Sequence, residues 1–262
     1  MEKNVWLRRF VMIGIPLFMA ILETTHPVHL KPTGVYRALS SHVDWWIFLH
    51  VIQLVLFGLL GLAVYWLVSG IRGLAATVAR ISVLCFVIFY NAFDALVGLG
   101  NGILIKYTQG TAPEQREVLE KAIDAFWTSG IATLITALAV TSWLIAVFAA
   151  MIARAEAESK RWLVLLGVVA VPFGLFSFPA GISGTLVWWI CVVGLGVVFA
   201  LLAKPRLSTG LLTVAALLFA SSHTPPWGPP GLFCFFLATL LVELNLEKQF
   251  AFRVQLARKS RA

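Results

Sequence analysis

Residues 45–68 read WWIFLHVIQLVLFGLLGLAVYWLV, a run without a single charged side chain. A helix needs about 20 predominantly apolar residues to cross the hydrocarbon core of a bilayer, so this run predicts a membrane-spanning helix. The whole chain has 262 residues, of which 60% are apolar and only 12% are charged. Soluble domains carry about 25% charged residues. The composition therefore excludes a soluble globular protein.

Further apolar runs on both sides of this one predict eight membrane-spanning helices in all. We expect an all-α membrane protein, a polytopic helical bundle that forms a single integral membrane domain over residues 1–262. The last two predicted spans are short, which leaves open a re-entrant hairpin over residues 207–246. The eight predicted spans cover residues 7–22, 45–68, 81–104, 128–152, 162–178, 184–203, 207–222 and 231–246.

The basic residues are distributed unequally between the connections of these spans. Of the 20 Lys and Arg residues, fifteen lie in the terminal segments and in every second connection. The remaining five are Lys31, Arg37, Lys106, Arg116 and Lys121. Cytoplasmic connections are enriched in Lys and Arg, so we expect a protein of the cytoplasmic (inner) membrane with both termini in the cytoplasm. The net charge of +8 then reflects orientation in the bilayer, and no nucleic-acid partner is expected.

The connection before residue 128 contains an amphipathic segment. Thr111 and Glu114 have the spacing of a capping box, and Pro113 fits the first turn of a helix. Apolar residues then recur at helical spacing, with charged residues between them. This pattern predicts an amphipathic helix on the outer membrane surface or over the mouth of the bundle. The apolar residues are Val118, Leu119, Ala122, Ile123 and Phe126.

Histidines and one buried acid form the candidate site, because all five histidines lie near the predicted outer ends of the spans. Imidazole and carboxylate groups are ligands for Zn or Cu, and Glu23 closely precedes the HxxH pair of His26 and His29. An ionisable group inside a span, such as Asp94, usually faces a protein interior or a wet cavity. The candidate metal ligands are His26, His29, His42, His50, Asp94 and His223.

These residues predict a shared site in which His223 approaches His42 or His50 and Asp94 lines the same cavity. Alternatively, the HxxH segment is a polar loop in water, and Asp94 makes a hydrogen bond to Gln53 or Tyr90 that serves assembly only.

The first functional hypothesis is a Zn or Cu site that serves metal handling, or metal-assisted chemistry on a small or lipid-like substrate. The alternative is a proton-coupled transporter or sensor without metal, in which Asp94 and His50 exchange protons. A b-type haem is a further alternative, with His50 and His223 as its axial ligands. The lipid bilayer is the expected partner, and the sequence leaves open the oligomeric state and whether the protein is an enzyme.

A short motif precedes the predicted span 184–203 on the same side of the membrane as His223. The residues Gly181-Ile-Ser-Gly184 resemble the GxSG motif of rhomboid intramembrane proteases, which implies a Ser183–His223 hydrolytic dyad. The AHxxGxxxG helix and the HxxxN element of that family are absent.

A second resemblance involves the residues Ser41, His42, Asp94 and His223. They are similar to the zinc-binding residues of alkaline ceramidases and adiponectin-receptor relatives, which implies a zinc hydrolase. The HxxxH pair of the seventh helix in that group is absent.

Overall fold

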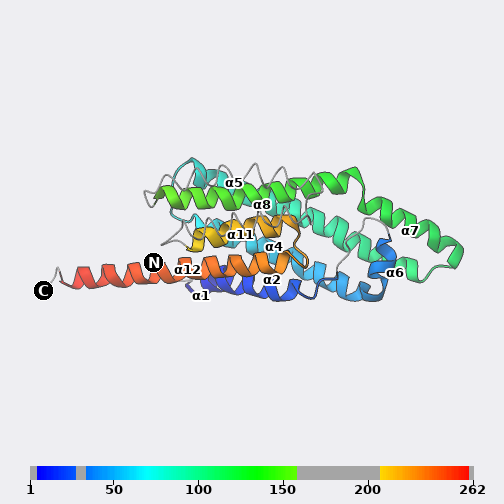
Figure 1. Ribbon diagram of the computed structural model, residues 1–262, viewed down its shortest axis with the longest axis horizontal. Helices are drawn as coiled ribbons and strands as arrows, with labels where there is room; N and C mark the ends of the chain where they lie inside the picture. Colours follow the sequence, from blue (N-terminus) through cyan, green and yellow to red (C-terminus); the bar gives the residue numbers. More distant parts are fainter. Residues whose placement is uncertain (1–4, 28–33, 158–206, 260–262) are drawn as a thin grey trace.

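The computed structural model describes residues 5–27, 34–157 and 207–259, and every regular element in these ranges is a helix (Figure 1). Adjoining elements continue one another into long helices, and two π-helical turns, η1 and η3, lie within them. The elements are α1 (Val5–Arg9), η1 (Phe10–Gly14), α2 (Ile15–Glu23), α3 (Val35–Leu39), η2 (Ser40–His42), α4 (Val43–Leu67), α5 (Leu74–Phe93), η3 (Asp94–Gly100), α6 (Asn101–Gln109), α7 (Pro113–Trp127), α8 (Gly130–Ala157), α11 (Leu207–Ser221) and α12 (Gly228–Lys259).

Four of the continuous helices are long and apolar enough to cross a membrane, and they indicate a membrane protein. The first four predicted spans coincide with them, so these four are confirmed as apolar helices of sufficient length. The four helices are Val5–Glu23, Val35–Leu67, Leu74–Gln109 and Pro113–Arg154.

The other four predicted spans are not established as membrane crossings. The predicted spans 207–222 and 231–246 correspond to α11 and α12, whose described apolar parts, Gly210–Ser221 and Gly228–Leu244, are shorter than the four long helices. The predicted spans 162–178 and 184–203 lie outside the described residues. The count of eight spans therefore stays a prediction.

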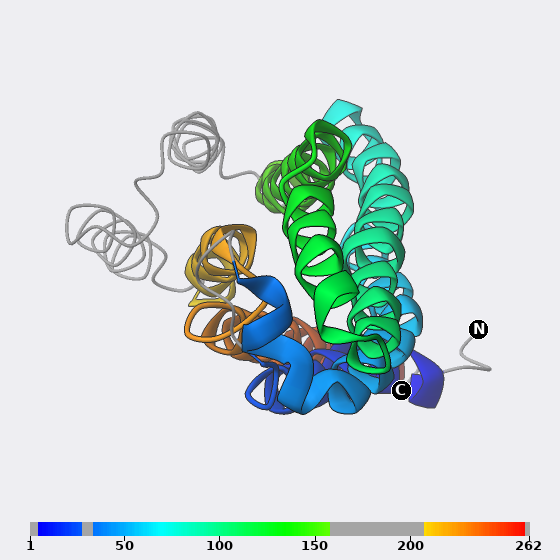
Figure 2. The same cartoon turned by 90° about the vertical axis from the view of Figure 1, so that its right-hand side faces the viewer.

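The long helices lie side by side along the longest axis of the molecule (Figure 1). Viewed along this axis, α5 packs beside α8, and α11 packs beside α12 (Figure 2). α6 and α7 form a hairpin at one end, which we call the hairpin end, whereas α1 begins and α12 ends at the opposite end (Figure 1). At about 1.5 Å per residue, the 36 residues of Leu74–Gln109 span about 54 Å. The hairpin therefore extends well past the roughly 30 Å of a bilayer core.

The predicted amphipathic helix is present as α7, but it starts differently from the prediction. Its position on the outer membrane surface or over the mouth of the bundle stays a prediction. The capping box is wrong: Ala112 is the N-cap, and the Thr111 hydroxyl donates to the Thr108 carbonyl at 2.8 Å. Pro113 does occupy the first turn, where its missing N–H has no intrahelical partner to lose. Ile123 is buried, whereas Val118 is 67% exposed. α7 runs along the long axis as one arm of the hairpin (Figure 1).

An aromatic core fills the space between α4, α5, α8 and α11. Phe57, Phe86, Trp143 and Phe219 are buried there together with Tyr90. The Trp143 indole donates to the Ala216 carbonyl at 3.2 Å, which satisfies its only polar atom. This core holds α11 against α8 and thereby positions the residues that follow α11.

Arginine side chains close the end of α4 that is opposite to the hairpin. The Arg80 guanidinium donates to the carbonyls of Val68 and Ile71 at 2.8 and 2.7 Å, and Arg154 donates to the carbonyl of Leu67 at 3.0 Å. The last carbonyls of a helix have no intrahelical donors, so these contacts satisfy them and complement the helix dipole.

Candidate metal centre

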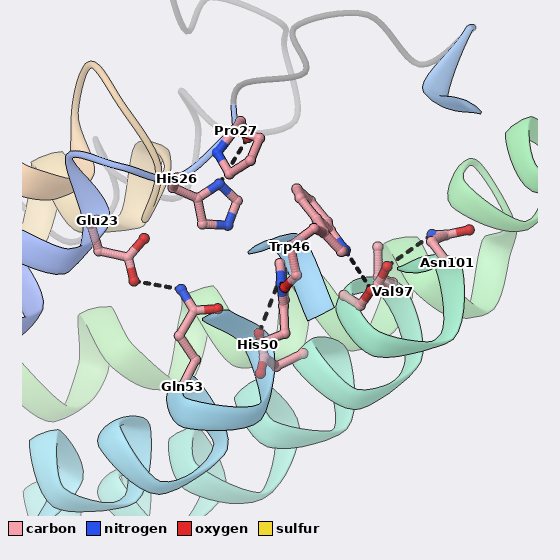
Figure 3. A network of polar contacts seen from close by, with 10 residues as sticks. Glu23, His26, Pro27, Trp46, His50, Gln53, Val97 and Asn101 are labelled. Atoms are coloured by element: carbon pink, nitrogen blue, oxygen red, sulfur yellow. Dashed lines mark hydrogen bonds and ion pairs between the residues drawn. The ribbon is translucent and has the colours of Figure 1, made fainter. Parts of the chain in front are cut away.

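His26 reaches the site because the chain turns sharply where α2 ends. The His26 backbone N–H donates to the Glu23 carbonyl at 3.2 Å, which continues the helical turn. The ring is 4% exposed, and its Nδ1 lies 2.9 Å from the Pro27 carbonyl (Figure 3). A carbonyl only accepts hydrogen bonds, so this contact places the proton on Nδ1 and leaves a lone pair on Nε2.

His50 is held in the same way, one turn after Trp46 on α4. Its Nδ1 lies 2.7 Å from the Trp46 carbonyl, and the ring is buried (Figure 3). The Trp46 indole donates to the Gly98 carbonyl at 2.7 Å, which ties α4 to the π-helical turn η3. The Nε2 of His50 is therefore also the nitrogen with a lone pair.

Gly98 is the reason why His50 fits between α4 and η3. A Cβ atom at this position would lie 1.9 Å from His50 Cδ2, far inside van der Waals contact. Gly228 has a similar role at His223, because a Cβ there would lie 1.6 Å from the His223 carbonyl oxygen. The two glycines thus allow the backbone approaches that bring these histidines into place.

His26, His50 and His223 come together from three distant parts of the chain. One ligand nitrogen from each lies within 4.8 Å of the other two, so the three are placed to hold one metal ion. The His26 ring centroid lies 5.2 Å from that of His50 and 5.1 Å from that of His223. Zn–N bonds are about 2.0–2.1 Å long, so the nitrogens need to approach by about 1 Å to bind one ion.

Two imidazole nitrogens of this cluster have no hydrogen-bond partner among the described residues. His26 Nε2 and His223 Nε2 are buried and have no hydrogen bond within the described residues. Burial lowers the pKa of His26 to about 4. Burial also holds the pKa of His223 well below its usual value, with further contributions from His26 and His50. Both rings are therefore neutral at pH 7, which is the state that binds a metal.

Asp94 lies directly beside the cluster, at the first residue of η3. Its Oδ1 is 3.8 Å from His50 Nε2, the side chain is fully buried, and neither carboxylate oxygen has a hydrogen-bond partner among the described residues. Glu23 is also buried and accepts a hydrogen bond from Gln53, three residues after His50 on α4 (Figure 3). Two acidic groups at this depth are costly unless cations or protons compensate them.

A cavity of about 200 Å³ opens beside the three histidines. Its lining residues come from α4, α5, η3, α7 and α8, from the end of α11, and from the segments that follow α2 and α11. Its wall is mainly apolar and aromatic, and includes Phe93, Val97, Val140 and Phe219. The arrangement thus combines a possible metal site with an adjoining space for a small molecule.

The other predicted site residues do not join this cluster in the described structure. His42 is exposed at the N-terminus of α4 and lies outside the group. His29 and Ser183 lie outside the described residues, and so does the proposed Ser183–His223 dyad. Of the predicted six, the structure therefore places His26, His50 and His223 together, with Asp94 beside them.

Two residues that position the site were not identified as such from the sequence. Trp46 was interpreted only as part of the apolar run 45–68, although its four-residue spacing from His50 indicates that both share a helix face. Gly98 was unremarked among the apolar residues of its span. Gly98 and Gly102 have the GxxxG spacing that allows close helix approach.

Comparison with protein-family models, with curated proteins and with solved structures finds no match to this chain. The functional assignment therefore depends on the geometry of the histidine cluster and its cavity.

Proposed function

We propose that this protein binds one Zn or Cu ion through His26, His50 and His223 and uses it for chemistry on a small or lipid-like substrate in the adjoining cavity. The observation that supports this most directly is the state of the imidazoles. Two of them direct Nδ1 at a backbone carbonyl and keep Nε2 free, which is the arrangement that orients metal-ligating histidines in proteins.

Three histidine ligands are typical of a catalytic metal site rather than of a structural one. Structural zinc sites are closed by four protein ligands, whereas catalytic sites keep a position open for water or substrate. When bound, such an ion supplies Lewis-acid and water-activating chemistry. When ionised, the Asp94 carboxylate, 3.8 Å from His50 Nε2, would compensate the charge of a divalent ion in this buried position.

An ion fits this cluster better than a b-type haem does. A haem with two axial histidines needs a flat slot between their rings. The His26 ring lies edge-on against both His50 and His223, at centroid distances of 5.2 and 5.1 Å, so a third imidazole packs against both candidate axial ligands.

We further propose that the hairpin end faces outward from the cytoplasmic membrane and that both termini are cytoplasmic. The excess of Lys and Arg in the terminal segments and alternate connections supports this orientation. The arginines that close α4, Arg80 and Arg154, are at the end that would then face the cytoplasm.

The test is metal binding by the full-length protein, purified in detergent or nanodiscs, with His42→Ala as the matched control. We expect about one Zn or Cu ion per chain. The variants His26→Ala, His50→Ala and His223→Ala should each weaken binding at least about 100-fold, at the upper end of what removal of a supporting residue causes. His42→Ala, an exposed histidine outside the cluster, should bind like the parent.

Circular dichroism and gel filtration identify any variant that fails to fold, and His50→Gln then replaces the alanine variant. Absence of metal binding in the folded parent would refute the proposal and favour a metal-free transporter or sensor. Equal losses in His42→Ala and the cluster variants would refute the assignment of the ligands.

A further inference from the structure

The polar groups of the cavity wall are largely engaged within the protein. The Thr136 hydroxyl donates to the Ala132 carbonyl at 2.7 Å, and the Ser221 hydroxyl donates to the Leu217 carbonyl at 2.7 Å. The Ser222 hydroxyl lies 2.7 Å from that of Thr224. These side chains therefore offer a bound molecule little hydrogen bonding.

Two polar atoms of residues that line the cavity have no hydrogen-bond partner among the described residues. They are the buried Nε2 atoms of His26 and His223. A molecule in the cavity thus meets polar chemistry mainly at the histidine cluster and apolar surface elsewhere. This contrast predicts a ligand with one polar end that coordinates the metal and an apolar remainder.

The size of the cavity limits how large the apolar remainder is. An apolar cavity of about 150 Å³ is enough to bind benzene. The cavity beside the histidines has a volume of about 200 Å³, which suits a substituted six-membered ring or a short alkyl segment. A full-length acyl chain exceeds this volume several-fold.

The composition of the wall favours a ring. Aromatic side chains approach the cavity from several elements, namely Tyr90, Phe93, Trp127 and Phe219. Tyr90 and Phe219 stack on each other with their ring centroids 5.6 Å apart, which fixes both rings in the wall. Aromatic faces and edges prefer such partners, beyond the gain from burying apolar area.

We propose that this cavity binds a compact aryl-sized apolar molecule whose single polar end coordinates the metal ion. The inference rests on the proposed function, because the metal supplies the polar contact. It narrows the substrate class from lipid-like molecules in general to small molecules of about ring size.

The experiment compares imidazole with 4-phenylimidazole as ligands of the cobalt-loaded protein. Co²⁺ replaces Zn²⁺ as a spectroscopic probe, so its visible bands report both metal binding and the coordination of an added ligand. Both compounds coordinate through the same ring, and they differ only in the phenyl group. Because apolar burial contributes about 25 cal/mol per Å², we expect 4-phenylimidazole to bind at least about tenfold more tightly.

Two alanines of α8, each replaced by leucine, provide the test variant and its matched control. Ala139 lines the cavity and is 1% exposed, whereas Ala137 is exposed on another face of the same helix. Ala139→Leu should reduce the preference for 4-phenylimidazole to less than about threefold while imidazole and Co²⁺ still bind. Ala137→Leu should keep the full preference. If Ala139→Leu fails to fold, Ala220→Leu, another cavity residue, takes its place.

The possible failures are distinguishable. If Co²⁺ binds but the parent prefers 4-phenylimidazole less than about threefold, the cavity proposal is overturned and the metal site stands. If Ala137→Leu loses the preference as Ala139→Leu does, the phenyl group does not occupy this cavity and the proposal is overturned as well. If the folded parent does not bind Co²⁺ at all, the proposed function fails and the cavity proposal fails with it.

Discussion

A single methyl group added at Gly98 should weaken metal binding about 100-fold, although Gly98 is not a ligand. A Cβ at this position would lie 1.9 Å from His50 Cδ2 and 2.7 Å from both Cγ and Nε2. Non-bonded carbon atoms require about 3.5–4.0 Å, so the ring must move by roughly 1.5 Å. Metal–ligand distances tolerate only about 0.2 Å. The displaced ring no longer ligates, and a 100-fold loss corresponds to about 2.7 kcal/mol.

Gly100→Ala is the control for this substitution, because Gly100 belongs to the same π-helical turn. A Cβ there meets Phe126 Cε1 at 3.5 Å, an ordinary contact. Both substitutions gain roughly 0.5–1 kcal/mol of helix propensity, so a difference between them reports the clash. The assay is zinc titration against a competing chelator, with thermal unfolding as a check on folding. Zinc binding by Gly98→Ala within about threefold of the parent would refute the reasoning.

Two further predictions concern the hairpin end and the pH dependence of stability. The Asp124 carboxylate accepts the backbone N–H groups of Gly34 and Val35, both at 2.9 Å, so Asp124→Asn should cost about 1–2 kcal/mol of stability. Glu117→Gln, in an exposed ion pair, should leave the stability nearly unchanged, and equal shifts in melting temperature would contradict this assignment. The pKa of His26 is about 4 in the folded protein and 6.5 ordinarily, so the unfolded chain binds more protons between these pH values. The metal-free protein should therefore lose roughly 3 kcal/mol as the pH falls from 6.5 to 4. Unfolding measured across this range should depend less on pH in His26→Gln, and identical profiles would argue against the buried neutral ring.

The sequence alone was sufficient for the four long apolar helices, because helix formation in a membrane depends on local composition. An uncharged run such as residues 45–68 satisfies its backbone groups internally, whichever neighbours surround it. At the start of α7, however, the local sequence pattern predicted the wrong N-cap. The capping-box pattern of Thr111 and Glu114 was present, but the Thr111 hydroxyl found an acceptor in the preceding helix, at Thr108.

The candidate site was predicted in outline, since depth along a span follows from counting residues. His50, His223 and Asp94 were expected to share one cavity. His50 and His223 do line one cavity, whereas Asp94 lies 3.8 Å from His50 Nε2 but is not among the lining residues. The sequence left open whether His42 or His50 approaches His223. Helix packing decides this point, because α4 directs His50 towards η3 and leaves His42 exposed at its first turn.

The tertiary structure determined the burial of the three histidines and the distances between their nitrogens. The turn after α2 buries His26, and the absence of a side chain at Gly98 admits His50 between two helices. A hydropathy pattern states which residues are apolar and at what depth they lie, but it contains no information on which helix faces meet. The packing of the helix faces sets the distances between the histidine nitrogens. Only the tertiary structure therefore brought three distant histidines within 4.8 Å of one another.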